Sequence, residues 1–277
     1  MPSLGLSLGP GGVRVLGAAG PTYDPDAAEW FEAVEATGAT FGPDSATVDA
    51  NKTAWSNWVI AQKNAESPIE GRSNWQQLTQ ADEGFIQPLM GVSTFNIPAL
   101  FGASEFINFV VGDYDPATGL RGGDGRRITS DKNWNNTPLN DVSAAVILTG
   151  PPTDTDSVGR IIGGQTSGFP EGIVNDGRIR SRDVSGGNTI SLFEISTPRT
   201  LVLSRHVENE FRGFNGGIYV FSDSSVVAAN EPVVFLNNQI RDRESDARIG
   251  LATYGRSIDV EAMNTACVAL SEAIVWH

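Results

Sequence analysis

From about residue 100 to residue 255 the sequence is divided into short apolar runs that are separated by clusters of glycine, aspartate, asparagine and serine. The runs alternate with period two or are rich in β-branched residues, which is typical of strands. No helical segment lies between them, so the long crossovers that parallel strands need are missing. We therefore predict an antiparallel sandwich or barrel. The predicted strands are Ile107–Val111, Val142–Leu148, Ile161–Ile162, Ile190–Ile195, Leu201–Leu203, Ile218–Phe221, Val233–Leu236 and Ile249–Tyr254.

Helical spacing of apolar residues marks the first third of the chain and its last stretch. Asp24 suits an N-cap and Pro25 the first helical position, while Asp44 or Ser45 caps the next helix and Asp259 the last. The predicted helices cover residues 24–38, 45–63, 74–78 and 259–274.

The helices carry four of the six tryptophans, namely Trp30, Trp55, Trp58 and Trp75. Exposed indoles would favour sugar stacking, but their spacing beside valine and phenylalanine favours a core between helices. The single cysteine, Cys267, lies on the apolar face of the closing helix, and we interpret it as a small buried apolar residue.

The first twenty residues alternate small and apolar residues with glycine too loosely to form a core. We interpret residues 1–20 as an extended arm that packs along another surface or becomes ordered on assembly. Residues 21–100 then form a helical region, and residues 101–277 form a β-sandwich domain that ends in a helix. The arm residues expected to make contacts are Leu4, Leu6, Leu8, Val13, Val15 and Leu16.

The composition excludes several classes of function. One cysteine cannot form an internal disulfide framework or a cysteine-based zinc site, and two histidines leave little for metal chemistry. A net charge of −14 argues against nucleic acid as a partner. No apolar run is long enough to span a bilayer, and the N-terminus lacks the pattern of a cleaved signal. We expect no metal, no cofactor and no membrane insertion.

Nucleophile and carboxylate patterns are weak. Ser204 and His206 share one face of a predicted strand but lack the glycine elbow of a hydrolase, so we interpret His206 as a surface residue at a strand end. Glu208 and Glu210 also share a face, as paired glycosidase acids would. A sandwich glycosidase carries a third acid at the next alternate position, where Arg212 stands, so the sequence favours a solvated edge.

Two acidic pairs resemble parts of calcium loops, at Asp113 and Asp115 and at Asp154 and Asp156, but neither is followed by a complete loop. The segment 113–119 is more simply a tight turn, in which Pro116 fixes φ. Arginines cluster among acids at residues 121–127, 178–182 and 241–248. This interleaving predicts ion pairs on strand faces or subunit contacts.

Residues 108–120, NFVVGDYDPATGL, resemble a run of the form N-F-V-x-G-D-Y-x-x-x-T-G-L found in structural proteins of tailed bacteriophages. In that family the run opens a concanavalin-like (laminin-G-type) β-sandwich, followed by a Gly/Asp turn and an asparagine-rich stretch. The turn matches residues 122–125 here, and the asparagine-rich stretch matches residues 133–136. The resemblance extends upstream to a helix at 28–36 and downstream to a penultimate strand at 251–255 that leads into the closing helix. The resemblance covers residues 25–277 loosely, and the arm lies outside it.

The resemblance implies a mainly β, antiparallel, concanavalin-like jelly roll with a helical N-terminal part and a closing helix. It implies a non-enzymatic virion protein of the tail, fibre or head surface, assembled in the host cytoplasm. Its expected partners are further copies of itself, in a trimer or larger assembly, and other virion proteins. Host-surface glycan is a further candidate partner, for which Trp134 in the asparagine-rich loop is the candidate residue. The alternative is a lectin-like module or a glycan-degrading enzyme on the same fold.

Overall fold

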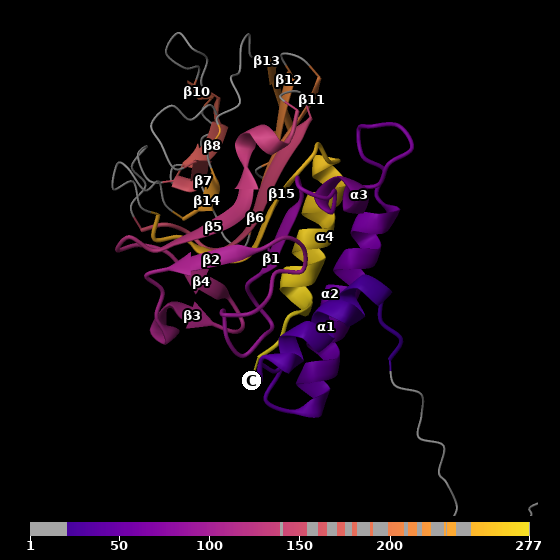
Figure 1. Cartoon of the computed structure of the whole chain (residues 1–277), viewed down its shortest axis with the longest axis vertical. Coiled ribbons are helices and arrows are strands. Elements are labelled where there is room, and N and C mark those ends of the chain that lie inside the picture. The colour runs from indigo at the N-terminus through magenta and orange to yellow at the C-terminus, as the bar shows by residue number, and fades with distance from the viewer. Residues whose placement is uncertain are drawn as a thin grey trace, which may run out of the picture.

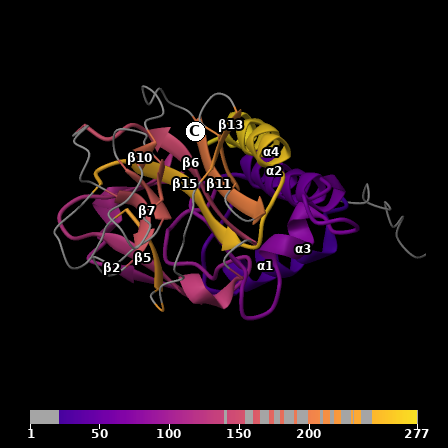
Figure 2. The same ribbon diagram turned by 90° about the horizontal axis from the view of Figure 1, so that it is seen from above.

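The computed structural model describes residues 21–276, with internal gaps at 139–140, 154–159, 165–170, 175–178, 182–188, 191–198, 208–209, 215–217, 223–229, 231 and 237–244. Within this part, two antiparallel sheets face each other, and helices cover the outer face of one of them (Figure 1). Seen from above, the helices form a separate layer on one side of the sheets (Figure 2). The predicted mainly β, antiparallel fold class with helical ends is confirmed.

The helix-covered sheet has the strand order β13-β12-β11-β6-β15-β4-β3, and β1 also pairs with β15. The second sheet has the order β10-β9-β8-β7-β14-β5-β2. Strands of the first sheet are β1 (Phe85–Pro88), β3 (Tyr114–Asp115), β4 (Gly119–Arg121), β6 (Val142–Gly150), β11 (Arg199–Val207), β12 (Glu210–Phe214), β13 (Ile218–Ser222) and β15 (Arg248–Gly255). Strands of the second are β2 (Ser104–Ile107), β5 (Arg127–Asn133), β7 (Arg160–Gly164), β8 (Glu171–Val174), β9 (Ile179–Ser181), β10 (Thr189–Ile190) and β14 (Pro232–Phe235).

The central strand β6 shows why this sheet has a continuous apolar run. Its residues Ala144, Val146 and Leu148 point into the core between the sheets. Ala145 and Ile147 point to the other side, into a core shared with the helices. A strand that is buried on both faces cannot alternate apolar and polar residues, even in an antiparallel sheet.

The helices begin and end close to the predicted positions. They are α1 (Pro25–Ala36), α2 (Ser45–Asn64), α3 (Asn74–Leu78) and α4 (Val260–Ala273). Asp24, Asp44 and Asp259 cap α1, α2 and α4, each accepting a hydrogen bond from a backbone N–H of the first turn. The side-chain carboxylate supplies the acceptor that these N–H groups lack inside the helix.

The tryptophans Trp30, Trp55, Trp58 and Trp75 lie in the core beneath the helices, as predicted. Neighbouring indoles meet edge to face, with ring centroids 5.6, 6.1 and 6.5 Å apart along the series. Cys267 is buried in the same core, and burial raises the pKa of its thiol to about 12. The prediction of a small buried residue on the apolar face of the closing helix is confirmed.

The predicted strand Ile107–Val111 is wrong after its first residue. β2 ends at Ile107, Asn108 has a φ of +63°, and Val111–Asp113 form a 3-10 turn. The left-handed conformation of Asn108 turns the chain out of the sheet. Val110 and Val111 therefore lie at the surface, although their β-branched side chains favour strands.

The predicted helical region contains β1, which pairs with β15 of the sandwich. Val202 and Leu251 of the sheet also belong to the same core as the helical tryptophans. The arm, residues 1–20, lies outside the described residues, as do most of the predicted strand Ile190–Ile195 and the acids Asp154, Asp156 and Glu208. Across the part of the chain that the structure describes, no helix has the length and apolar character to cross a membrane.

Candidate functional site

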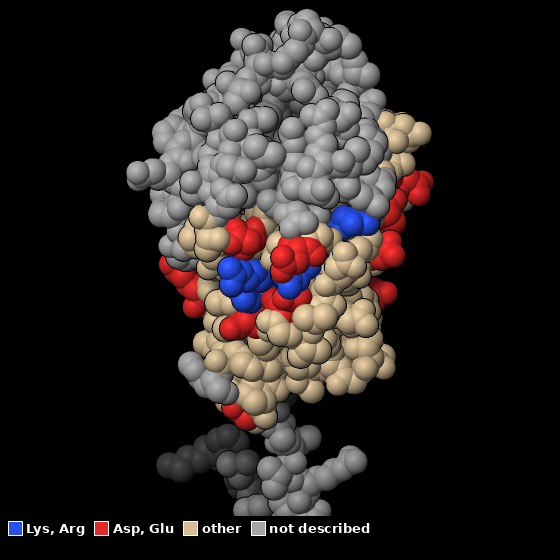
Figure 3. Space-filling view, turned by 90° about the vertical axis from the view of Figure 1, so that its left-hand side faces the viewer, with Lys and Arg blue, Asp and Glu red and all other residues tan. Residues whose placement is uncertain are grey.

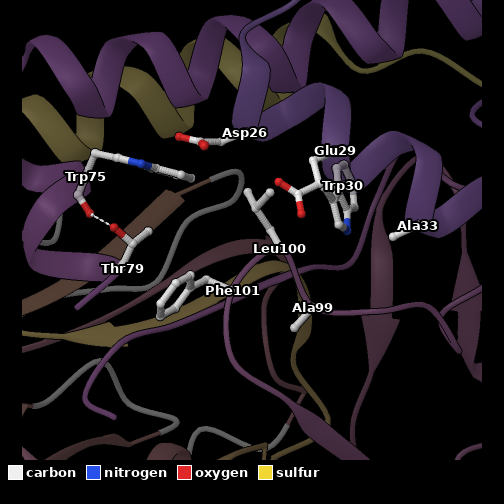
Figure 4. A pocket seen from close by; sticks show the side chains of 9 residues that line it. All are labelled: Asp26, Glu29, Trp30, Ala33, Trp75, Thr79, Ala99, Leu100 and Phe101. Atoms are coloured by element: carbon white, nitrogen blue, oxygen red, sulfur yellow. Dashed lines mark hydrogen bonds between the residues drawn. The ribbon is translucent and has the colours of Figure 1, made fainter. Parts of the chain in front are cut away.

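A pocket of about 390 Å³ opens between the first turns of α1, the short helix α3 and the segment that follows Pro98 (Figure 4). Its walls combine three aromatic side chains with two carboxylates. The lining residues are Asp26, Glu29, Trp30, Ala33, Trp75, Thr79, Ala99, Leu100 and Phe101. A wider hollow adjoins it and shares Asp26 and Trp75. We call the first of these the Trp75 pocket.

The acidic wall is set by the start of α1. Asp24 caps the helix by accepting from the N–H of Asp26 at 3.0 Å, and Pro25 occupies the first helical position. This start fixes Asp26 and Glu29 one helical turn apart, so that both reach the same side of the helix. In Figure 4 the Glu29 carboxylate lies beside Leu100, on the side that faces Asp26 and Trp75.

The apolar floor is held by hydrogen bonds between distant segments. Trp30 Nε1 donates to the carbonyl of Pro98 at 3.0 Å. The backbone N–H groups of Leu100 and Phe101 donate to the carbonyl of Ile86 in β1, at 2.8 and 3.2 Å. These bonds tie the segment that follows Pro98 to α1 on one side and to the sheet on the other.

Lys63, at the end of α2, lines the adjoining hollow beside Trp75. Its Nζ lies 2.7 Å from an oxygen of Asp24 and 2.7 Å from an oxygen of Asp26. It also lies 5.5 Å from the centroid of the Trp75 ring, in a cation–π contact. Burial alone would lower the pKa of Lys63, but the hydrogen bonds to the two aspartates outweigh it and raise the pKa.

Glu29 differs from Asp26 because no described residue forms an ion pair or hydrogen bond with its carboxylate. The pocket therefore carries one carboxylate that is paired with Lys63 and one that has no described partner, over an apolar floor. Its described lining has no cysteine, serine or histidine, and Thr79 Oγ1 donates to the carbonyl of Trp75 at 2.8 Å. This arrangement suits binding of a cationic group better than nucleophilic chemistry.

The expected exposure of Trp134 is wrong. Trp134 is 3% exposed and lies in the core between the sheets, where its ring meets Tyr254 edge to face at 5.2 Å. Its Nε1 donates to the carbonyl of Gly163 at 3.2 Å. With neither face of the indole open to solvent, this side chain cannot stack on a sugar in the described conformation.

The other sequence candidates have structural roles where the structure describes them. The Ser204 hydroxyl is fully buried and bound to the backbone of Ile258 at 3.0 Å. His206 is partly exposed near the end of β11, in keeping with the interpretation as a strand-end residue. Among the described residues no group of three or more histidine, cysteine or acidic side chains could hold a metal ion.

Acidic and basic side chains alternate on the face that carries the edge of the two sheets (Figure 3). Arg126 pairs with Asp113 at 2.8 Å and with Asp124 at 3.2 Å, and Arg121 with Asp246 at 3.5 Å. The predicted ion pairs are confirmed for Arg121 and Arg126.

The segment 108–120 forms a firmly anchored turn at this edge. One oxygen of Asp113 accepts from the N–H of Val110 at 2.9 Å and also pairs with Arg126. The Tyr114 hydroxyl donates to the carbonyl of Val92 at 2.6 Å, and burial raises the pKa of this phenol. Asp115 accepts from the N–H groups of Ala117 and Thr118, which confirms the predicted tight turn.

No protein-family model and no curated protein matches this sequence. Among solved structures, a sialidase from Trypanosoma rangeli, in complex with 2,3-difluorosialic acid, is similar with a TM-score of 0.49 and 9% identity. Domain 4 of an extracellular arabinanase from Geobacillus stearothermophilus, in complex with arabinotriose, is similar with a TM-score of 0.40 and 11% identity.

The aligned region covers 81% of this chain and 38% of the sialidase, so the chain spans well under half the length of that enzyme. For the arabinanase domain the shares are 72% of this chain and 94% of that chain.

Proposed function

We propose that this chain is a non-enzymatic structural subunit of a tailed-bacteriophage particle, in a tail, fibre or head-surface position, that works by assembling with copies of itself. The proposal is supported by the resemblance of residues 108–120 to virion proteins and by the surface turn that this segment forms. Its single strongest support is the surface turn at Val110 and Val111.

Val110 and Val111 are 61% and 85% exposed, and they are the two most exposed large apolar residues of the described part. Directly behind them the chain is fixed by the Asp113–Arg126 pair, and Phe109 packs with Phe95 and Phe106. A rigid turn that presents apolar side chains to solvent loses little entropy on binding, which is typical of protein interfaces.

The geometry supports assembly better than sugar binding at the predicted position. Trp134, the one aromatic residue predicted to contact glycan, is buried between the sheets. Ser204, which shares a strand face with His206, has its hydroxyl bound to backbone groups of Ile258. Both residues therefore serve the fold, and the proposed function needs neither of them at the surface.

The test compares the assembly state of wild type with that of a Val110→Ser, Val111→Ser variant by light scattering at micromolar concentration. The wild type is expected to form a trimer or larger assembly. The protein concentration at half-assembly is expected to be about tenfold higher for the variant than for the wild type. Val268→Ser is the matched control, because Val268 is also an exposed valine but lies on α4. A monomeric wild type, with and without residues 1–20, would contradict the proposal.

A further inference from the structure

The Trp75 pocket has the electrostatic character of a receptor for a cation. Asp26 and Glu29 are the charged residues of its lining, and both are acidic. Lys63 pairs with Asp26 at 2.7 Å, whereas Glu29 has no partner among the described residues. An acidic group beside an apolar floor attracts a positive charge that is carried on an apolar stem.

The aromatic walls do not offer a sugar-stacking platform. Trp30 is 3% exposed and Trp75 is 9% exposed, and Lys63 lies over the ring of Trp75. A pyranose needs an open ring face, and these two indoles are almost fully buried. The pocket is therefore better shaped for a side chain of a polypeptide than for a glycan.

The arm has the complementary chemistry. Arg14 is the one charged side chain in residues 1–20, and it is flanked by Val13, Val15 and Leu16. The arm thus carries a single positive charge within an apolar stretch. This matches the one acid that has no described partner and the Leu100–Phe101 floor of the pocket.

The length of the arm sets how far Arg14 can lie from the described part of its chain. Arg14 precedes Pro21, the first described residue, by seven residues. At about 3.3–3.6 Å per residue, these span about 23–25 Å when extended. In an assembly of identical subunits, each arm can then occupy the pocket of the next subunit, so every subunit makes the same contact.

We propose that residues 13–16 of one subunit dock in the Trp75 pocket of a neighbouring subunit, with Arg14 paired to Glu29. This proposal rests on the proposed function, because it requires an assembly. It assigns the contact that holds the arm, and it gives Glu29 a partner that the described residues lack.

The test exchanges the charges of the proposed pair in the full chain. Arg14→Glu and Glu29→Arg each place like charges together, so each should raise the concentration at half-assembly about tenfold. The double variant restores an opposite pair and should assemble as wild type does. The measurement is the mass distribution by sedimentation velocity across a dilution series.

Mixing the two single variants tests whether the contact is between subunits. The acidic arm of the Arg14→Glu chain can then meet the basic pocket of the Glu29→Arg chain, and the mixture should assemble at lower concentration than either variant alone. Rescue in the double variant without rescue in the mixture would place the arm in the pocket of its own chain. That result would overturn the proposed exchange.

A control on the same helix separates the pocket from general charge effects. Glu32 is exposed on α1 but does not line the pocket, so Glu32→Arg should not rescue Arg14→Glu. If neither the double variant nor the mixture is rescued while the wild type still assembles, the docking proposal fails and the proposed function stands. A monomeric wild type refutes both.

The alternative occupant of the Trp75 pocket is a sugar, and a binding measurement tests it. In the chain without residues 1–20, a neutral trisaccharide is expected to leave the tryptophan fluorescence unchanged. A saturable change that Glu29→Gln abolishes would make the pocket a glycan site and would overturn the docking proposal.

Discussion

Trp134 lies in a 3-10 turn and Trp75 in the short helix α3, and their surroundings differ. Trp134 is enclosed between the two sheets, with its Nε1 bound to the carbonyl of Gly163. Trp75 belongs to the core beneath the helices and also lines the pocket. The same residue type thus serves the fold in one place and borders a surface site in the other, depending on what lies opposite.

The largest expected effect comes from removing the indole between the sheets. Trp134→Ala should lower the free energy of unfolding by about 3–5 kcal/mol, because it leaves a cavity against Tyr254. Trp75→Ala should cost less, about 2–3 kcal/mol, since part of the vacated space opens into the pocket. Urea unfolding of both variants checks the order, and an equal or larger loss for Trp75→Ala would break the comparison.

A smaller effect is expected from removing the Tyr254 hydroxyl, which forms hydrogen bonds to the turn that carries Trp134. Tyr254 Oη lies 2.8 Å from Thr137 Oγ1 and 3.2 Å from the carbonyl of Trp134. Tyr254→Phe keeps the ring contact but leaves these buried polar atoms without that partner, which should cost about 1–2 kcal/mol. Thermal unfolding measures the loss. A neutral or stabilising substitution would show that the hydroxyl does not hold the turn.

The smallest effect is expected on the Trp75 side. Lys63→Met should lower the free energy of unfolding by about 1 kcal/mol or less, because the ion pairs with Asp24 and Asp26 are partly exposed to solvent. The loss should shrink as salt is added. A loss of stability as large as that of Trp134→Ala would mean that these ion pairs stabilise the fold as much as the buried core does.

The pH dependence of this contribution has a definite sign. The pKa of Lys63 is raised in the folded chain above its ordinary value of 10.5. Its stabilisation is therefore complete below that pH and is lost as the pH rises through the folded-state value. Wild type and Lys63→Met should differ in stability at pH 8 and converge in strongly alkaline solution. A difference that grows with pH would contradict this assignment.

The helices could be predicted because their start signals are local. Asp24, Asp44 and Asp259 each cap a helix through a hydrogen bond to a residue two or three positions further along. The central strands could be predicted because burial on both faces makes them apolar throughout, as in β6. Where the signal for a helix or strand lies within a few residues, the sequence is sufficient to predict that element.

The site could not be predicted, because it depends on contacts between distant segments. The pocket joins residues near 26, 75 and 100, and the spacing within each gives no sign of the others. The asparagine-rich context of Trp134 correctly indicates a turn, but it does not indicate that the opposite sheet covers the indole. At Ile107–Val111, β-branched residues favoured a strand, and the left-handed Asn108 ended it.

The central claim is that the chain works as an assembled subunit whose arms join neighbouring copies through the Trp75 pocket. The most direct test is sedimentation velocity of the equimolar mixture of Arg14→Glu and Glu29→Arg beside each variant alone. The account predicts that the mixture forms assemblies at concentrations where each variant is dissociated. A mixture that sediments as the sum of its two separate components would contradict it.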